Sequence, residues 1–307
     1  MEKLILDTDI GVDDAVAVRY AMLTHDMLGY TCSYGNVAVE TAVKNCKLAM
    51  DVYKKDIPVY RGASRPLSRP PMPLSTHIHG KDGLGEYYEN HFDSDASNAV
   101  SFIIEQAKKY PGEVTLATIG PLTNLALALN LCPQLPKLLK KVVSMGGAFG
   151  TDGHSGNMTQ FAEFNILNDP EAADLVFASD LPLVVVPLDV THKVLITDSE
   201  IAATKDEFLV NVTKFYLDFT RKYEHFAGMA VHDALTVSYL LHPEKYQTIE
   251  TPLAVSCSGI TDGQTLRPTT DYAVPFDKFK DRPKHTLCLG VDIDFVKQSM
   301  LDCLTKG

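Results

Sequence analysis

Residues 3–18 read Lys3-Leu-Ile-Leu-Asp-Thr-Asp-Ile-Gly-Val-Asp-Asp-Ala-Val-Ala-Val18, and this stretch decides the fold. Its apolar start over 4–6 predicts a short buried strand, and the run from Ala15 onward predicts a helix. Gly11 supplies the backbone freedom that a tight strand-to-helix turn requires. The stretch therefore predicts a strand, a sharp turn and a helix as the first unit of an α/β protein.

Four carboxylates crowd this turn, namely Asp7, Asp9, Asp13 and Asp14. An acid in the first turn of a helix gains only about 0.3–1 kcal/mol from the helix dipole. Two like charges about 4 Å apart repel by roughly 4 kcal/mol at an effective dielectric constant of about 20. The cluster therefore indicates a bound cation. Oxygen ligands favour calcium or magnesium, and no His or Cys lies in this window to favour zinc.

Several interpretations of the acidic turn compete. An EF-hand loop is excluded because Val12 and Val18 occupy the positions that require Gly and Glu. An Asp-x-Asp phosphatase would use Asp7 as the phosphoryl acceptor and Asp9 as the acid. A metal-activated water is the third interpretation, and a negatively charged helix cap without a ligand is the structural alternative.

Composition and charge limit the class of protein. A chain of 307 residues with 45% hydrophobic content can bury a large core, and we see no repeat or linker that would divide it. We therefore expect a single domain over 1–307. The net charge of −11 argues against nucleic acid polymers and anionic membranes as partners.

The sequence also indicates a cellular compartment. The six cysteines form no Cys-x-x-Cys pair, which is typical of free thiols in a reducing compartment. The start of the chain does not resemble a signal peptide, and the longest apolar run, 181–190, contains two prolines and an aspartate. We therefore expect a soluble, cytoplasmic protein.

Strand-like and helix-like segments alternate along the first two-thirds of the chain, which predicts an open, mostly parallel (mixed) central sheet with helices on both faces. The expected strands are 4–6, 27–34, 57–60, 114–119, 142–145, 183–187, 253–257, 271–274 and 286–291. The expected helices begin at Ala15 and cover 40–53, 98–110, 121–130, a segment from 169, much of 199–241, and 295–304. The stretch 61–91 is irregular and contains His77-Ile-His79-Gly, so we expect it to be functional.

Polar groups follow several predicted strands where each strand ends. They are Asp9, Asn36, the backbone at Ile119 and Gly120, and the backbone at Met145 and Gly146. Ligands of open parallel sheets bind beyond the carboxyl ends of the strands, so we expect these groups to meet in one crevice.

Five segments in the same order resemble one family. The segment 7–15 is similar to the N-terminal signature of the inosine–uridine preferring nucleoside hydrolases, with Ile10 in place of the usual proline. The others are 34–36, 119–124 leading to 143–147, 162–165 and 231–234. The resemblance covers nearly the whole chain, and it implies a Rossmann-like nucleoside hydrolase fold.

The resemblance also implies a metal and a reaction. Ca²⁺ would be held by Asp9, Asp14, Asp233 and the backbone carbonyl of Ile119. The reaction would be hydrolysis of the N-glycosidic bond of ribonucleosides, with uridine and cytidine as expected substrates and inosine as a further candidate. Asp9 would be the general base, and His232 would supply a proton to the leaving base.

Further residues match family positions that contact the substrate. They are Asp13, Asn36, His79, Met145, Asn157, Glu163 and Asn165, with Asn157 and Glu163 at the 5′ end of the ribose and His79 in a lid near the base. Tyr223 and Phe226 are candidates for stacking on the base, although aromatic residues at helical spacing are more often core. We interpret His192 as structural.

Two other functions stay open at this stage. One is the Asp-x-Asp phosphatase, which needs a phosphate-binding Lys or Arg that the matched segments lack. The other is a nucleoside-binding protein without turnover. The family resemblance further implies a homodimer or homotetramer.

Overall fold

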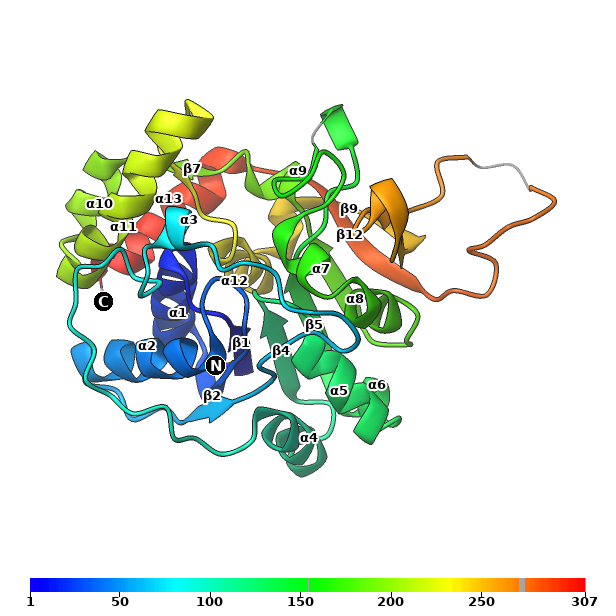
Figure 1. Cartoon of the computed structure of the whole chain (residues 1–307), viewed down its shortest axis with the longest axis horizontal. Helices are drawn as coiled ribbons and strands as arrows, with labels where there is room; N and C mark the ends of the chain where they lie inside the picture. Colours follow the sequence, from blue (N-terminus) through cyan, green and yellow to red (C-terminus); the bar gives the residue numbers. More distant parts are fainter. Residues whose placement is uncertain (154, 271–273, 307) are drawn as a thin grey trace.

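The computed structural model describes residues 1–153, 155–270 and 274–306, and its centre is one eight-stranded sheet (Figure 1). The strand order is β3-β2-β1-β4-β5-β6-β12-β9. The strands are β1 (Lys3–Thr8), β2 (Asp26–Cys32), β3 (Val59–Arg61), β4 (Val114–Thr118), β5 (Leu139–Met145), β6 (Leu183–Val186), β9 (Tyr246–Pro252) and β12 (Lys284–Val291). All neighbouring strands are parallel except β9 and β12. The predicted mixed, mostly parallel sheet is confirmed.

Alternation along the central strand β1 separates two apolar layers. Leu4 and Leu6 pack into one core cluster, and Ile5 packs into the other. Because successive side chains of a strand point to opposite faces, each face of the sheet carries its own layer of helices, as predicted. The first face is covered by α1 (Val12–Thr24), α2 (Val39–Val52), α11 (Glu207–Phe219), α12 (Ala234–Leu241) and α13 (Ile293–Lys306), and the second by α4 (Ala99–Lys109), α5 (Thr123–Leu131), α6 (Leu135–Leu138) and α8 (Pro170–Phe177).

Short helices lie in the connections. They are α3 (Thr76–His79), α7 (Phe164–Asn168), α9 (Leu188–Thr191) and α10 (Asp198–Thr204). Within 62–91, α3 is the only helix or strand among the described residues, so this stretch is largely irregular, as expected. The sheet draws strands from residue 3 to residue 291, which supports our proposal of a single domain.

The C-terminal third differs from the sequence prediction. Strand β9 was not predicted, because this edge strand exposes Gln247 and Thr248 and therefore lacks a clear apolar alternation. The expected strand 253–257 is only β10 (Ala254–Val255), which pairs with β11 (Thr265–Leu266) in a separate small sheet. The expected helical region 199–241 is interrupted by β8 (Met229–Ala230), which pairs with β7 (Leu195–Ile196). Most of the expected strand 271–274 lies outside the described residues.

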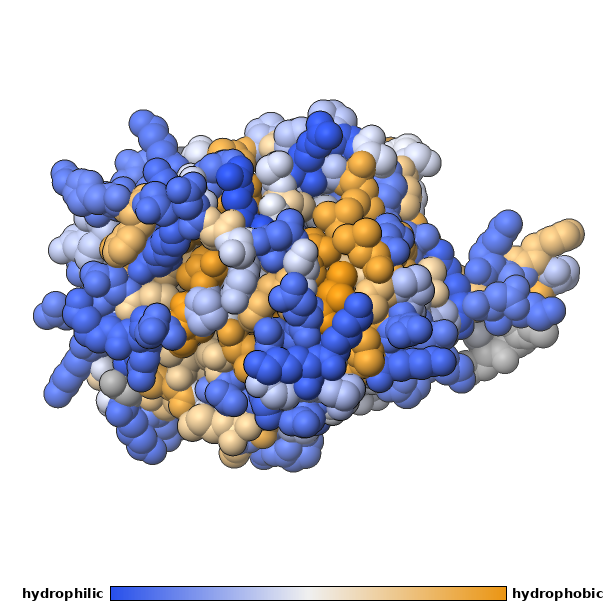
Figure 2. All heavy atoms as spheres, turned by 90° about the horizontal axis from the view of Figure 1, so that it is seen from below, coloured by the Kyte–Doolittle hydropathy of each residue, from blue (hydrophilic) through white to orange (hydrophobic). Residues whose placement is uncertain are grey.

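Two further features bear on the sequence expectations. All six cysteines are free, and Cys32, Cys46, Cys132 and Cys288 are buried. Within the described part of the chain, no helix has both the length and the apolar character needed to cross a membrane. Described residues between β11 and β12 project from the body at the right of both views (Figure 1 and Figure 2).

Candidate active site

The turn between β1 and α1 is built around Asp14. The hydroxyl of Thr8 donates to Asp14 Oδ1 at 2.6 Å, and the Gly11 N–H donates to Asp14 Oδ2 at 2.8 Å. A Cβ atom at Gly11 would lie 2.7 Å from His79 Nδ1, so a larger residue does not fit there without a shift. The acidic turn is therefore as tight as the sequence predicts, and Ile10 is accommodated in it without a proline.

Three carboxylates meet at the carboxyl edge of the sheet. Asp13, Asp14 and Asp233 each place an oxygen within 4.8 Å of the other two, and all three side chains are buried. Asp13 and Asp14 lie in the first turn of α1, whereas Asp233 directly precedes α12. The convergence that the sequence predicts for Asp14 and Asp233 is present, and Asp13 joins them.

Asp9 completes this group of acids, which we call the acid centre (Asp9, Asp13, Asp14 and Asp233). Its Oδ2 accepts the backbone N–H of Asn36 at 2.6 Å, and Asn36 Nδ2 donates to Asp14 at 3.1 Å. Asp9 Oδ1 is buried and accepts no hydrogen bond from the described residues. A buried carboxylate oxygen without a partner is costly unless a cation or a water binds it.

The electrostatics of the acid centre favour a cation. Burial and the charge of Asp14 raise the pKa of Asp13 to about 8. Burial, reinforced by Asp14, also raises the pKa of Asp9. Burial and Asp13 raise the pKa of Asp233. None of the described residues that line the adjoining pocket is Lys or Arg. These oxygen donors fit a hard divalent ion, which would compensate their charge.

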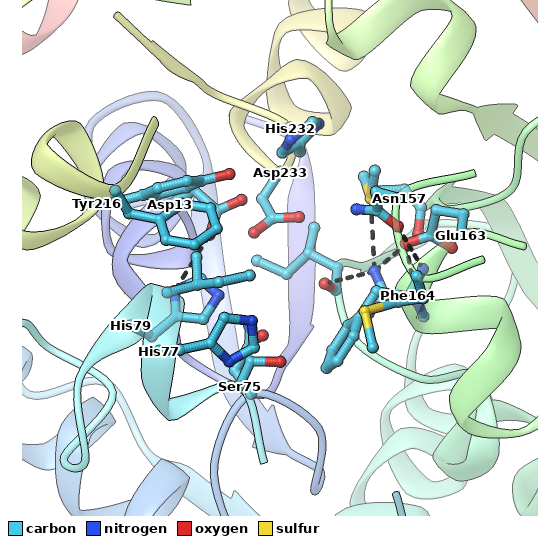
Figure 3. A pocket seen from close by; sticks show the side chains of 17 residues that line it. Asp13, Ser75, His77, His79, Asn157, Glu163, Phe164, Tyr216, His232 and Asp233 are labelled. Atoms are coloured by element: carbon cyan, nitrogen blue, oxygen red, sulfur yellow. Dashed lines mark hydrogen bonds and ion pairs between the residues drawn. The ribbon is translucent and has the colours of Figure 1, made fainter. Parts of the chain in front are cut away.

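Asp13 and Asp233 of the acid centre form the floor of a cavity of about 150 Å³ (Figure 3). Asp13 and Asp233 point toward its middle. His77, His79 and Tyr216 lie on one side, and Asn157, Glu163 and Phe164 lie on the other. The remaining lining residues are Asn36, Ser75, Ile78, Ile119, Met145, Met158, Asn165, Phe219 and His232. Apart from Asp9 and Asp14, which adjoin the floor, every site residue predicted from the sequence lines this cavity.

The side of the cavity formed by 145–165 is held by hydrogen bonds. Asn165 Nδ2 donates to the carbonyl oxygens of Ile119 at 3.1 Å and Met145 at 3.3 Å. Glu163 caps α7 by accepting the N–H groups of Asn165 at 2.8 Å and Ile166 at 3.0 Å, and it also accepts from Gly147 at 2.9 Å. These bonds fix the ends of β4 and β5 and the start of α7 relative to one another.

Asn157 belongs to the same side but is exposed. Its Oδ1 accepts the N–H of Phe164 at 3.0 Å, which ties the loop to α7. The carbonyl of Ile119, expected as a metal ligand, lines the cavity while accepting from Asn165.

Two buried histidines reach the cavity from different elements. The Val12 N–H donates to His79 Nδ1 at 3.1 Å, so the neutral ring carries its proton on Nε2. Burial lowers the pKa of His79 to about 3. His232 Nδ1 hydrogen bonds with the hydroxyl of Thr191 at 2.7 Å, and burial together with His192 lowers its pKa. Both rings are therefore neutral hydrogen-bonding groups. His79 lies at the end of α3 rather than in an open loop.

The aromatic residues that line the cavity differ from the two suggested by the sequence. Tyr223 is 61% exposed, and neither it nor Phe226 lines the cavity. Tyr216 and Phe219 of α11 do so, with Tyr216 edge-on to His79 at 5.6 Å between ring centroids. Their spacing along the amphipathic helix is that of core residues, so no specific signal in the sequence distinguishes them.

Several residues that were not predicted as site residues lie in or beside the cavity. His192, interpreted as structural, lies edge-on to His232 at 5.1 Å between ring centroids. Ser75, His77, Met158 and Phe164 line the cavity but were not predicted, although His77 belongs to the histidine-containing stretch that was singled out.

The structure does not support the phosphatase alternative. Asp7 is fully buried, does not line the cavity, and accepts from Thr31 at 2.5 Å and Asn124 at 2.8 Å. A phosphoryl acceptor must be accessible, and Asp7 is not. It must also be accompanied by a cationic side chain, and no described residue of the cavity lining is Lys or Arg.

Fold and site together define a class: an α/β protein with a buried carboxylate centre beneath a small-molecule pocket at the carboxyl edge of its sheet. Comparison with known proteins then gives the family. The family model described as "Inosine-uridine preferring nucleoside hydrolase" matches residues 4–298. The chain belongs to this family, and the resemblance seen in its motifs is confirmed.

Individual relatives cover almost the whole chain. The chain is similar to the "Probable uridine nucleosidase 1" of Oryza sativa subsp. japonica, with 34% identity over 276 residues, 86% of this chain and 84% of the relative. Among solved structures it resembles the plant nucleoside hydrolase PpNRh1, with a TM-score of 0.94, 29% identity, and 100% and 99% coverage. It also resembles a purine-preferring ribonucleoside hydrolase from Gardnerella vaginalis, with a TM-score of 0.90, 31% identity, and 99% and 98% coverage.

The acid centre should bind a divalent cation more tightly as the pH rises. Without a cation, Asp13 has a pKa of about 8, so at pH 6 a cation must displace protons that are largely absent above pH 8. We expect the affinity for Ca²⁺ to rise by up to about tenfold per pH unit for each proton displaced. Isothermal titration calorimetry in buffers of different ionisation enthalpy measures both affinity and proton release. Asp233→Asn should weaken binding, and a pH-independent affinity without proton release would contradict this account.

Proposed function

We propose that the protein is a Ca²⁺-dependent hydrolase that cleaves ribonucleosides, chiefly uridine and cytidine and also inosine, into ribose and free base. The observation that carries the proposal is the juxtaposition of the buried acid centre with a pocket that has a polar side and an aromatic side. The uridine nucleosidase among its relatives supports pyrimidine substrates, and the purine-preferring structural neighbour supports inosine as a further one.

The metal ligands that we propose are Asp9, Asp14, Asp233 and the carbonyl of Ile119. The position of Asp233 beside Asp14, and the raised pKa of the buried Asp9 next to Asp14, support this set. When bound, Ca²⁺ would hold the cis-diol of the sugar and lower the pKa of the attacking water.

Asp9 is the proposed general base. Its Oδ2 is held by the Asn36 N–H, which leaves Oδ1 to accept a proton from the attacking water. In the reaction, the C1′–N bond breaks as a C1′–O bond forms, and positive charge develops on the sugar. Asp13 lines the floor of the cavity, where it can accept a hydrogen bond from the 2′-hydroxyl and stabilise the positive charge on the sugar.

The rest of the ribose is assigned to the polar side of the cavity. Asn157 and Glu163 are proposed to face its 5′ end, and Asn36 and Asn165 its hydroxyl groups, next to Met145. Glu163 and Asn165 are already oriented by their hydrogen bonds, so they lose little conformational entropy on binding.

The leaving base is assigned to the aromatic side. His232 and His79 are neutral, and the Nε2–H group of His79 can donate a hydrogen bond to the departing base. His232 is proposed to assist the departing base through the N–H group of its neutral ring, and Tyr216 and Phe219 are proposed as the rings that contact the face of the base.

Asp9→Asn should lower the kcat for uridine by at least about a hundredfold, because it removes the general base. Released ribose measured across a panel of nucleosides, with and without a chelator, tests the function itself. Asp7→Asn is the matched control, since Asp7 lies in β1 just before Asp9 but outside the cavity, and this variant should retain activity. A phosphatase would show the reverse pattern on a phosphomonoester, and binding without any released ribose would indicate a non-catalytic binding protein.

His232→Ala should impair inosine and uridine hydrolysis unequally, with a loss of about ten- to a hundredfold for the more affected substrate. Purine and pyrimidine bases carry their acceptor atoms at different positions, so they depend differently on a donor at one place. The kcat/KM values of both substrates check this. Equal and small losses would make His232 a structural residue.

We also propose that the chain forms a homodimer or homotetramer through the segment between β10 and β12. Ile260 is 87% exposed and Phe276 is 90% exposed there, so both rely on a partner for burial. We propose a second copy of the chain as that partner, in line with the homo-oligomer that the family resemblance implies.

Phe276→Asp should therefore lower the mass measured by sedimentation equilibrium toward that of one chain, because the charge opposes burial of this side chain. Tyr87→Asp changes another exposed aromatic residue outside the segment and should leave the mass unchanged. An unchanged mass in Phe276→Asp would place the interface elsewhere.

A further inference from the structure

A buried carboxylate joins three helices away from the cavity. Asp206 Oδ2 accepts from Arg19 Nε at 3.1 Å, and its Oδ1 accepts from the Tyr53 hydroxyl at 3.0 Å and the Leu209 N–H at 3.1 Å. The Arg19 guanidinium also lies 4.1 Å from the centroid of the Tyr53 ring. The side chains of Arg19 and Asp206 are only 9% and 6% exposed. Both oxygens of Asp206 and the Nε–H group of Arg19 therefore have hydrogen-bond partners inside the protein.

Two of the three helices carry residues of the cavity or the acid centre, and the third follows a residue of the cavity lining. Arg19 lies in α1, whose first turn carries two acids of the acid centre. Tyr53 follows α2, which begins shortly after Asn36. Asp206 caps α11, and Tyr216 lies about 15 Å further along that helix, at the rise of about 1.5 Å per residue. The junction thus links the elements that bear the sugar-binding floor to the helix that bears the aromatic side.

Apolar packing alone does not fix how far α11 sits along α1. Phe208, Leu209 and Val212 of α11 are buried in the same core cluster as α1, and apolar contacts of this kind tolerate small shifts along the helix axes. A buried ion pair with directional hydrogen bonds is satisfied in one register, and a shifted register would leave a buried charge unpaired. We call the Arg19–Asp206 ion pair the bridge. It is the contact between α1 and α11 that favours one position of α11 along α1 over a shifted one.

We propose that Arg19 and Asp206 are positioning residues for the base-binding end of the cavity. Their bridge sets the register of α11 against α1, and so the distance from Tyr216 and Phe219 to the acid centre. The proposal rests on the proposed function, in which these two rings contact the base. Its consequence is selective: loss of the bridge weakens recognition of the base and spares recognition of the sugar, which is bound at the strand ends and the start of α1.

The test compares two ligands that are not cleaved. Pseudouridine, whose base is joined to the sugar by a carbon–carbon bond, would contact both the sugar end and the base end of the cavity. Ribose would contact only the sugar end. In Asp206→Asn, which keeps a good helix-capping residue and removes the charge, we expect the Kd of pseudouridine to rise about tenfold and the Kd of ribose to change by less than about twofold. Isothermal titration calorimetry with saturating Ca²⁺ measures both.

Three further variants accompany this experiment, one as a control and two as independent tests of the bridge. Asp218→Asn makes the same change on α11 at an exposed ion pair with Arg221. Because an exposed ion pair contributes little to stability, this variant should alter neither Kd. Tyr53→Phe removes only one hydroxyl bond to Asp206, so it should show a smaller shift of the same kind even if Asp206→Asn folds poorly. Arg19→Met removes the other partner and should reproduce the selective loss.

The outcomes separate the inference from the proposed function. Equal weakening of both ligands, or a lowered melting temperature with both Kd values unchanged, would overturn the inference and leave the bridge as a stabilising contact only. It would also be overturned if the unaltered protein bound pseudouridine no more tightly than ribose. If the protein binds pseudouridine but releases no ribose from any nucleoside, the proposed function fails, and the comparison of the two Kd values still decides the role of Arg19 and Asp206.

Discussion

Mutual repulsion among buried carboxylates is the constraint on which this structure depends. The hydrogen bonds that Thr8, Gly11 and Asn36 donate to the acid centre contribute roughly 1.5–3 kcal/mol each at best. Burial of several charges in one place costs more than that unless they are protonated or paired with a cation. Cation binding and the stability of the β1–α1 turn are therefore linked, and an ion held by these carboxylates would lie beside the cavity.

The two sides of the cavity are organised by different forces. Asn165 and Glu163 hold the polar side through directional bonds between strand ends, which fixes their positions closely. The opposite side is formed by rings, with Tyr216 edge-on to His79, whose Nδ1 accepts the Val12 N–H. Under the proposed function, the hydrogen-bonded side would hold the sugar and the ring-lined side would contact the base.

The sequence predicted what is local and missed what depends on packing. The acidic turn, the alternation of strands and helices, and the loop around His79 all follow from neighbouring residues. Asp233 could be joined to them only through the family resemblance, because nothing near it in the chain indicates its partners. Tyr216 and Phe219 were missed because a ring that lines a cavity has the same helical spacing as a ring in the core. Strand β9 was missed because an edge strand needs few apolar residues.

The neutral histidines limit how the proposed reaction can end. Burial lowers the pKa of both His79 and His232, so neither ring stores a proton near neutral pH. A neutral ring still donates through its remaining N–H group, and that bond strengthens as negative charge grows on the departing base. Bases whose carbonyl oxygens spread that charge, such as uracil and hypoxanthine, need only this help. A base such as adenine needs full protonation to leave readily, so the buried histidines themselves favour oxo-substituted bases.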